Sequence, residues 1–191
     1  MFFSSKNPAL LLIDIQKGLD QHSFYGSERN NLDAEKNASI ILQKWRTNKL
    51  PIFHVKHSSQ NLASPLHKSK PGFKIKDEVK PINGEPVFVK KVNSAFIGTN
   101  LEKTLKEEGI VEVIIVGLTT NHCVSKSVRM SSNLGFKTYL ISDACAAFNA
   151  MGLNGEFFAA ELIHQTTLAS LNKEFATIIN TDGLLLELVT N

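Results

Sequence analysis

Short apolar runs alternate along the chain with segments in which apolar residues recur every three or four positions. The first pattern is typical of buried strands, and the second of helices with one buried face. The apolar runs predict six strands, at residues 9–15, 52–55, 87–89, 111–116, 136–141 and 175–179. The helical pattern falls between them, at residues 34–45, 100–108, 123–134 and 155–171. This alternation is typical of a parallel sheet with helices on both faces.

We expect residues 1–191 to form a single α/β domain, a three-layer α/β/α arrangement around a doubly wound sheet. For about six parallel strands with right-handed crossovers, we predict the strand order 3-2-1-4-5-6. Strands one and four then lie side by side where the winding reverses, and ligands bind there beyond the carboxyl ends of the strands. The connection at residues 58–86 is unusually long, and loops of this length often cover active sites.

Composition narrows the class of protein and of partner. The 191 residues are 42% hydrophobic and 20% charged, close to globular averages, with a net charge of only +3. Acidic residues interrupt the lysine-rich stretch at residues 68–80, which favours a solvated loop over a nucleic-acid surface. No apolar run has secretory or membrane-spanning length, and two cysteines make no disulfide framework. We therefore expect a cytoplasmic protein that binds a small-molecule substrate and neither nucleic acid nor membranes.

Three polar residues stand where predicted apolar strands end, and together they indicate catalysis. Asp14 and Lys90 end two strands, and Cys123 lies just inside the helix after the fourth. The free N–H groups and positive dipole end of a helix N-terminus favour a thiolate. Cys123 would attack a carbonyl carbon, Asp14 would move the proton, and Lys90 would hold Asp14 and stabilise negative charge. The backbone N–H groups of Thr119 and Cys123 would stabilise the oxyanion. Each residue alone also fits a structural role, but the coincidence of all three favours chemistry.

Four motifs carry a resemblance to a known family. They are LLIDIQ at residues 11–16, KKVNSAF at 90–96, GLTTNHCV at 117–124 and SDA at 142–144. Their sequences and spacings resemble the isochorismatase-like cysteine hydrolase superfamily, which also contains nicotinamidases and N-carbamoylsarcosine amidases. The resemblance implies an Asp-Lys-Cys triad, a cis peptide in the cysteine loop, and a homodimer or homotetramer. In this chain the triad maps to Asp14, Lys90 and Cys123. The cis bond maps to Leu118–Thr119, where it would aim the Thr119 N–H into the oxyanion hole.

The resemblance also bears on cofactors. Nicotinamidases bind a metal through an Asp-x-His pair and a later histidine. This chain has His54, His57 and His67 in that region but no Asp-x-His. Residues 54 and 57 of an extended segment point to opposite faces, which is a poor arrangement for one ion. We therefore expect no bound metal and no organic cofactor.

The predicted function is hydrolysis of a small amide or ureide through a thioester on Cys123. True isochorismatases attack a vinyl ether and need no cysteine, so Cys123 favours a carbonyl substrate. Three alternatives stay open: a metal-assisted nicotinamidase, a true isochorismatase and a non-catalytic binding protein. Substrate contacts are predicted at Phe24, His54, Asn93 and Asn121.

Overall fold

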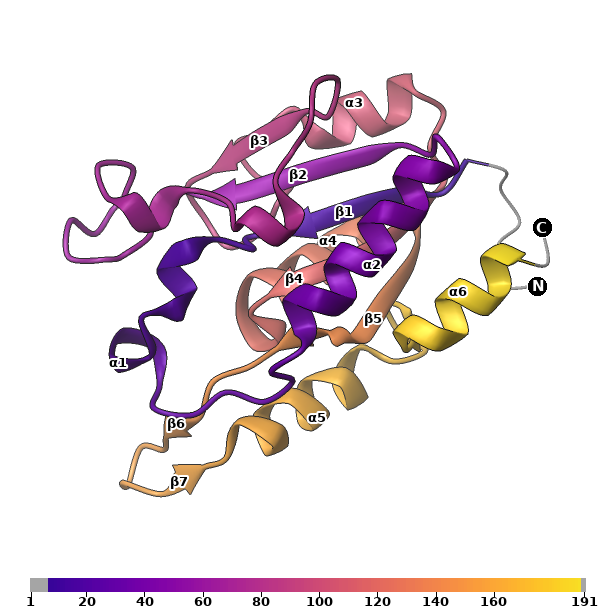
Figure 1. The fold of residues 1–191 in the computed structure, drawn as a ribbon. Coiled ribbons are helices and arrows are strands. Elements are labelled where there is room, and N and C mark those ends of the chain that lie inside the picture. Colours follow the sequence, from indigo (N-terminus) through magenta and orange to yellow (C-terminus); the bar gives the residue numbers. More distant parts are fainter. Residues whose placement is uncertain (1–6, 190–191) are drawn as a thin grey trace.

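Six parallel strands form one sheet at the centre of the molecule (Figure 1). The structure, a computed structural model, describes residues 7–189. The strands of the sheet run in the order β3-β2-β1-β4-β5-β8, which confirms the predicted order and the doubly wound α/β fold. Their bounds are β1 (Ala9–Ile13), β2 (Ile52–His57), β3 (Val87–Lys90), β4 (Glu112–Leu118), β5 (Lys137–Ala146) and β8 (Thr177–Ile179).

Helices cover both faces of this sheet and complete the three layers (Figure 1). Two helices pack on one face, α2 (Ala34–Thr47) and α6 (Thr181–Val189). Three pack on the other, α3 (Leu101–Glu107), α4 (Ser125–Asn133) and α5 (Ala160–Leu171). In the part of the chain that the structure describes, no helix is both long and apolar enough to cross a membrane.

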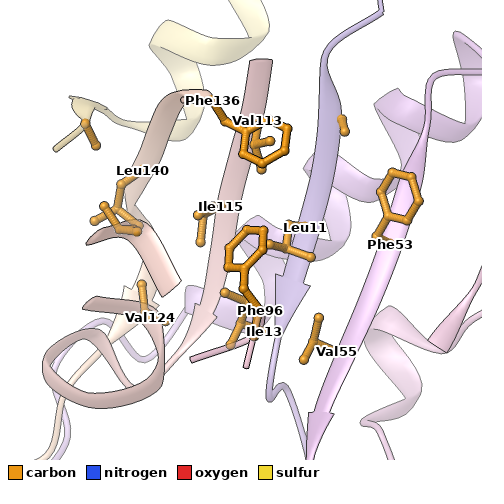
Figure 2. Packing of buried hydrophobic residues seen from close by; sticks show 14 of the residues in the cluster. Leu11, Ile13, Phe53, Val55, Phe96, Val113, Ile115, Val124, Phe136 and Leu140 are labelled. Atoms are coloured by element: carbon orange, nitrogen blue, oxygen red, sulfur yellow. The ribbon is translucent and has the colours of Figure 1, made fainter. Parts of the chain in front are cut away.

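Strand β1 shows why its apolar residues form a continuous run and do not alternate with polar residues. Leu11 and Ile13 point into the cluster under α3 and α4 (Figure 2), whereas Leu10 and Leu12 point into the cluster under α2. A strand that is buried on both faces needs apolar side chains at every position. Truncating one such leucine to alanine costs about 2–5 kcal/mol, so this strand is fixed firmly in place.

The segment that carries the cysteine differs from the predicted helix at residues 123–134. A single π turn, η4 (Thr120–Val124), comes first, and the regular helix α4 starts only at Ser125. Cys123 therefore lies inside an irregular turn between β4 and α4. π turns often occur at functional sites, because they re-aim a side chain without breaking the helix.

The predicted helix at residues 155–171 starts later, at Ala160. The residues before it form an antiparallel hairpin of β6 (Ala150–Met151) and β7 (Phe157–Phe158). Gly155 lies in the turn of this hairpin with a φ of +87°, a conformation that glycine adopts without steric cost. The apolar residues of this segment therefore belong partly to a hairpin and only partly to a helix.

The connections after β1 and β2 form the rim around the carboxyl ends of the strands (Figure 1). Each contains short helical turns that the sequence pattern did not predict. They are η1 (Lys17–Asp20), α1 (His22–Tyr25), η2 (Pro71–Phe73) and η3 (Asp77–Val79).

Candidate active site

Asp14, Lys90 and Cys123 meet beyond the carboxyl ends of three strands. Asp14 follows β1, Lys90 ends β3, and Cys123 lies in the η4 turn after β4. The Lys90 Nζ lies 2.6 Å from Asp14 Oδ2 and 3.2 Å from Cys123 Sγ. Strand β2 lies between β3 and β1, so the Lys90 side chain reaches across it to make both contacts. The structure thus brings the three predicted residues together at one point.

The backbone at Asp14 turns sharply at the end of β1. Its φ is +52°, in the left-handed region that aspartate tolerates better than most residues. Its N–H still donates to the Val55 carbonyl at 2.9 Å, which ties the bend to β2. The side chain is only 1% exposed, and its Oδ1 has no hydrogen-bond partner within residues 7–189. One carboxylate oxygen is therefore held by Lys90, and the other is free for a proton.

Burial controls the protonation of this group of side chains. It raises the pKa of Asp14, and the charge of Lys90 only partly opposes this effect. It also raises the pKa of the Cys123 thiol, which the Asp14 charge raises further while Lys90 opposes the shift. Burial of the thiol therefore opposes the thiolate that the helix start was expected to favour, and the charge of Lys90 offsets this only in part.

His57, the last residue of β2, is a fourth member of this group. Its Nδ1 lies 3.2 Å from the Lys90 Nζ. Burial and the Lys90 charge lower the pKa of His57, so the ring is neutral. An ammonium can only donate, so Nδ1 accepts and Nε2 carries the ring proton. The sequence placed His57 and His54 on opposite faces of β2, but it did not show which one faces the site.

Ser127 on α4 links the cysteine turn to the segment after Lys90. Its hydroxyl donates to the Cys123 carbonyl at 2.7 Å and accepts from the Ala95 N–H at 2.9 Å. The side chain is fully buried. The KKVNSAF and GLTTNHCV motifs are therefore joined by one hydroxyl, which fixes the lysine and cysteine segments relative to each other.

A buried histidine supports the other side of the same turn. His164 of α5 is 2% exposed, and its Nδ1 lies 2.9 Å from Thr120 Oγ1. Its Nε2 lies 3.4 Å from the Asn31 Nδ2, which also donates to the Cys145 carbonyl at 2.7 Å. Burial lowers the pKa of His164, so the ring stays neutral. These contacts connect α5, the loop after β1 and strand β5 to the turn that carries Cys123.

Gly117 allows β4 to pass close to β1 just before the site. A Cβ at this position would lie 2.1 Å from the Ile13 carbonyl oxygen, so only glycine fits. The following peptide bond, Leu118–Thr119, is cis, as the family resemblance implies. The close approach of β4 to β1 next to Asp14 and Cys123 therefore requires glycine at position 117.

A cavity of about 350 Å³ opens over Asp14 and Cys123. Leu19, Tyr25, Leu66 and Leu118 give it an apolar wall. Its other lining residues are polar: His57, Ser59, Ser64, Asn93, Thr119 and His122. A smaller chamber of about 80 Å³ lies beside it and shares Tyr25, Thr119 and His122. An apolar wall that faces polar groups is typical of a site for a small ligand.

The four predicted substrate contacts have different places in the structure. Asn93 lines the main cavity and Asn121 lines the side chamber. Phe24 lines neither; its ring is 46% exposed and packs edge-on against Tyr25. His54 is buried away from the cavity, where its Nε2 contacts Glu85 Oε2 at 2.9 Å. The predictions for Phe24 and His54 are corrected accordingly, because the pleat of β2 turns His57 and not His54 toward the cavity.

Asp14, His57 and Cys123 are close enough to hold a metal ion, with one ligand atom of each within 4.8 Å of the others. The ammonium of Lys90 already lies 2.6–3.2 Å from these same three side chains. A positive charge at this place is therefore supplied by the chain itself. An added cation would be repelled by Lys90, so these residues do not fit a metal site.

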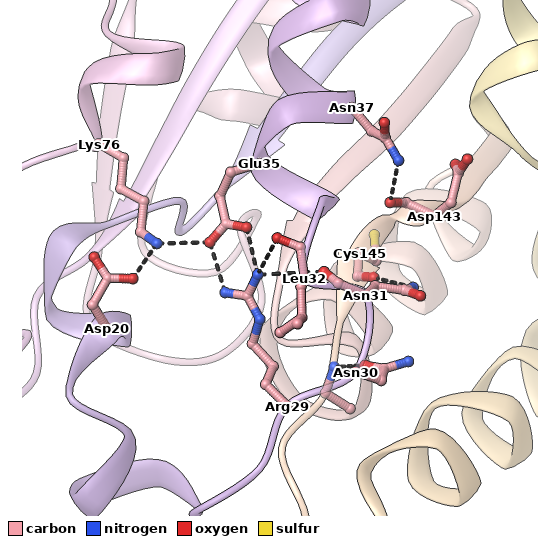
Figure 3. A network of polar contacts seen from close by, with 11 residues as sticks. Asp20, Arg29, Asn30, Asn31, Leu32, Glu35, Asn37, Lys76, Asp143 and Cys145 are labelled. Atoms are coloured by element: carbon pink, nitrogen blue, oxygen red, sulfur yellow. Dashed lines mark hydrogen bonds and ion pairs between the residues drawn. The ribbon is translucent and has the colours of Figure 1, made fainter.

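A network of ion pairs holds the rim of the cavity (Figure 3). Glu35 of α2 accepts from both Nη atoms of Arg29, at 2.7 and 2.6 Å, and from Lys76 Nζ at 2.6 Å. Lys76 also pairs with Asp20. The loop after β1 and the loop after β2 are thereby both tied to α2. These contacts lower the pKa of Glu35 to about 2, although its burial acts in the opposite direction.

Comparison with known proteins identifies the family. The model of the isochorismatase domain matches residues 8–183, which include Asp14, Lys90 and Cys123. The chain belongs to the isochorismatase family. The isochorismatase family protein YrdC of Bacillus subtilis (strain 168) is 49% identical over 177 residues, covering 93% of this chain and 94% of the relative.

Other members of the isochorismatase family resemble this chain in structure or in sequence. A crystal structure of a hydrolase of the family from Chromobacterium violaceum superposes with a TM-score of 0.94 at 38% identity, covering 99% of this chain and 97% of that one. Nicotinamidase 3 of Arabidopsis thaliana is 33% identical over 102 residues, covering 53% of this chain and 46% of the relative. The chain therefore has the fold of this isochorismatase-family hydrolase over nearly its whole length.

Proposed function

We propose that this member of the isochorismatase family is a cysteine hydrolase that cleaves a small amide or ureide C–N bond. The observation that carries the proposal is the position of Lys90, whose Nζ contacts Asp14 Oδ2 at 2.6 Å and Cys123 Sγ at 3.2 Å. Nucleophile, proton carrier and cation thus lie within contact of each other beside a cavity of about 350 Å³.

In the first half of the proposed reaction, Cys123 Sγ attacks the substrate carbonyl carbon and its proton passes to Asp14. The free Oδ1 of Asp14 is suited to receive it, because burial raises the pKa of this carboxyl and makes it a stronger base. The negative charge that forms on the carbonyl oxygen is stabilised by the N–H groups of Thr119 and Cys123. The C–N bond then breaks, the nitrogen takes the proton from Asp14, and a thioester remains on the sulfur.

In the second half, water attacks the thioester carbon and gives a proton to Asp14. The C–S bond breaks, the acid leaves, and the proton returns from Asp14 to the Cys123 sulfur. Lys90 supplies positive charge to both the carboxylate and the sulfur throughout. Neutral His57 accepts a hydrogen bond from Lys90 and thereby orients its ammonium.

The positions of the histidines also separate this proposal from the metal-assisted alternative. A metal near the substrate would need several ligands that face the cavity, but His54 is buried against Glu85 and His67 does not line the cavity. The name of Nicotinamidase 3 supports an amide substrate for the family, and the thiol of Cys123 is suited to a carbonyl carbon. We therefore favour an amide or ureide over a vinyl ether.

Kinetics of variants on a panel of amides and ureides test the proposal. Cys123→Ala and Asp14→Asn should each lower kcat/KM at least about a thousandfold, because each removes a group that makes or breaks a bond. Asp14→Asn should still bind substrate, since its shape is retained. Cys145→Ala, which removes the other, fully buried cysteine, is the matched control and should retain activity. Half of the parent rate in Cys123→Ala would overturn the mechanism.

A further inference from the structure

The lining of the cavity is poor in positively charged side chains. Within residues 7–189, neither the main cavity nor the side chamber is lined by a lysine or an arginine. Lys90 is fully buried, and its ammonium already contacts Asp14, His57 and Cys123. A substrate carboxylate would therefore meet no free cation here.

The histidines of the lining do not supply one either. Burial lowers the pKa of His57 and of His122, and the charges of Lys90 and Lys126 respectively lower them further. Both rings are thus neutral near pH 7. The remaining charged group is the carboxylate of Asp14, which would repel an anion. Bringing a carboxylate into such a cavity without a counter-charge is costly.

Two polar atoms at the side chamber lack partners. The Tyr25 hydroxyl and the Asn121 Oδ1 are both buried without a hydrogen bond within residues 7–189. Ser64 approaches the Tyr25 hydroxyl but does not reach hydrogen-bond geometry. The Asn121 Nδ2 lies 3.3 Å from the His122 Nε2, and a neutral ring that accepts this hydrogen bond leaves the Asn121 oxygen for a ligand. A buried donor or acceptor that stays unpaired is costly, so both atoms are suited to a ligand.

We propose that this cavity selects uncharged amides and that the polar end of the substrate lies between Tyr25 and Asn121. The phenol donates to a carbonyl-type oxygen of this end, and the Asn121 oxygen accepts from an N–H or O–H group. The side chamber of about 80 Å³ admits a group of only a few atoms. This inference rests on the proposed function, because Cys123 must be the atom that the substrate approaches.

A pair of alkylating agents tests the charge selection without knowledge of the natural substrate. Iodoacetamide and iodoacetate have nearly the same shape and differ by one negative charge. We would measure their second-order rate constants on Cys123 by peptide mass spectrometry and divide one by the other. The same ratio on glutathione corrects for intrinsic reactivity. We expect the iodoacetamide-to-iodoacetate rate ratio on Cys123 to exceed the same ratio on glutathione at least about tenfold.

Two variants of equal net charge locate the effect. Asn121→Lys places a cation at the chamber and should lower the ratio at least about tenfold, toward the glutathione value. Asn154→Lys adds the same charge at the exposed turn of the β6–β7 hairpin and should leave the ratio unchanged. The ratio of the parent protein is decisive even if Asn121→Lys fails to fold.

Three results would count against the account. A parent ratio equal to that of glutathione would overturn the selection of uncharged substrates. Equal ratios in folded Asn121→Lys and Asn154→Lys would overturn the place of the polar end. Turnover of an amide without an acyl adduct on Cys123 after acid quenching would overturn the proposed function itself, and with it this inference.

Discussion

Asp14 combines a left-handed backbone, nearly complete burial and a contact with Lys90. The burial has the larger effect on its pKa, which is raised even though a cation lies 2.6 Å away. A carboxyl with a raised pKa holds a proton more readily, and this suits a group that must take a proton and return it. The same burial raises the pKa of the Cys123 thiol, and in the proposed reaction one proton passes between the two residues.

The pH dependence of activity follows from this arrangement. The reaction needs ionised Asp14, so kcat/KM should fall as the pH drops through its raised pKa and be retained above it. The acid limb should therefore lie above the ordinary carboxyl value of 3.8. A pH profile on the best amide measures it, and His57→Gln should still show an acid limb above that value, since His57 only lowers the pKa of Asp14. A limb at or below the ordinary value would contradict the role of Asp14.

Gly117 is the residue at which the backbone leaves the least room. In Gly117→Ala the new methyl group would collide with the Ile13 carbonyl, so β4 and β1 would have to separate. We expect a loss of at least about 3 kcal/mol in the free energy of unfolding. Gly135→Ala is the matched control: φ is also positive, but nothing lies within 4 Å, so it should cost only about 1–2 kcal/mol. Urea unfolding compares the two, and equal losses would refute the steric argument.

At the scale of elements, two of the buried serines of α4 offer a direct comparison. Ser127 joins the Cys123 carbonyl to the Ala95 N–H, whereas Ser131 accepts from Thr138 Oγ1 at 2.8 Å away from the site. Ser127→Ala leaves the Ala95 N–H unpaired and should cost about 1–3 kcal/mol of stability, whereas Thr138 keeps its bond to the Phe136 carbonyl in Ser131→Ala, which should cost less. Only Ser127→Ala should also lower kcat, by about tenfold or more, because the cysteine turn loses its link to the lysine segment. Similar kcat values in the two variants would show that Ser127 acts only on stability.

Glu35 acts between elements, since it ties two loops of the rim to α2. Its pKa is lowered to about 2, so it contributes stability above the unfolded value near 4.5 and loses it as the pH falls toward 2. Glu35→Gln should therefore lower the free energy of unfolding by about 2–3 kcal/mol at pH 7, with a smaller difference at pH 3. Glu102→Gln, which breaks the exposed pair with Lys106, is the control and should cost at most about 0.5 kcal/mol. A loss from Glu35→Gln that is the same at both pH values would contradict the role of its charge.

For the molecule as a whole, the sequence predicted the sheet and the three residues that meet at its edge, but less of their surroundings. Continuous apolar runs such as the one in β1 predict the strand order, because strands buried on both faces occur in few topologies. Asp14, Lys90 and Cys123 stand out because each is polar where an apolar strand ends. The pleat of β2, which turns His57 to the site and His54 to Glu85, depends on packing that the sequence does not display.

The surroundings were harder to predict because they come from loops. Leu19 lies in a short helical turn after β1, and Ser64 and Leu66 come from the long connection after β2. No periodic pattern marks their positions. The rise in the pKa of Cys123 was not predicted for a related reason: the position near a helix start is visible in the sequence, whereas the degree of burial is not.

The central claim is that an acyl group passes through Cys123. Rapid acid quenching of the protein during turnover of an amide, followed by peptide mass spectrometry, tests it most directly. The account predicts an acyl adduct on Cys123 and none on Cys145, released by hydroxylamine as expected for a thioester. Turnover without any adduct on Cys123, together with full activity in Cys123→Ala, would contradict it.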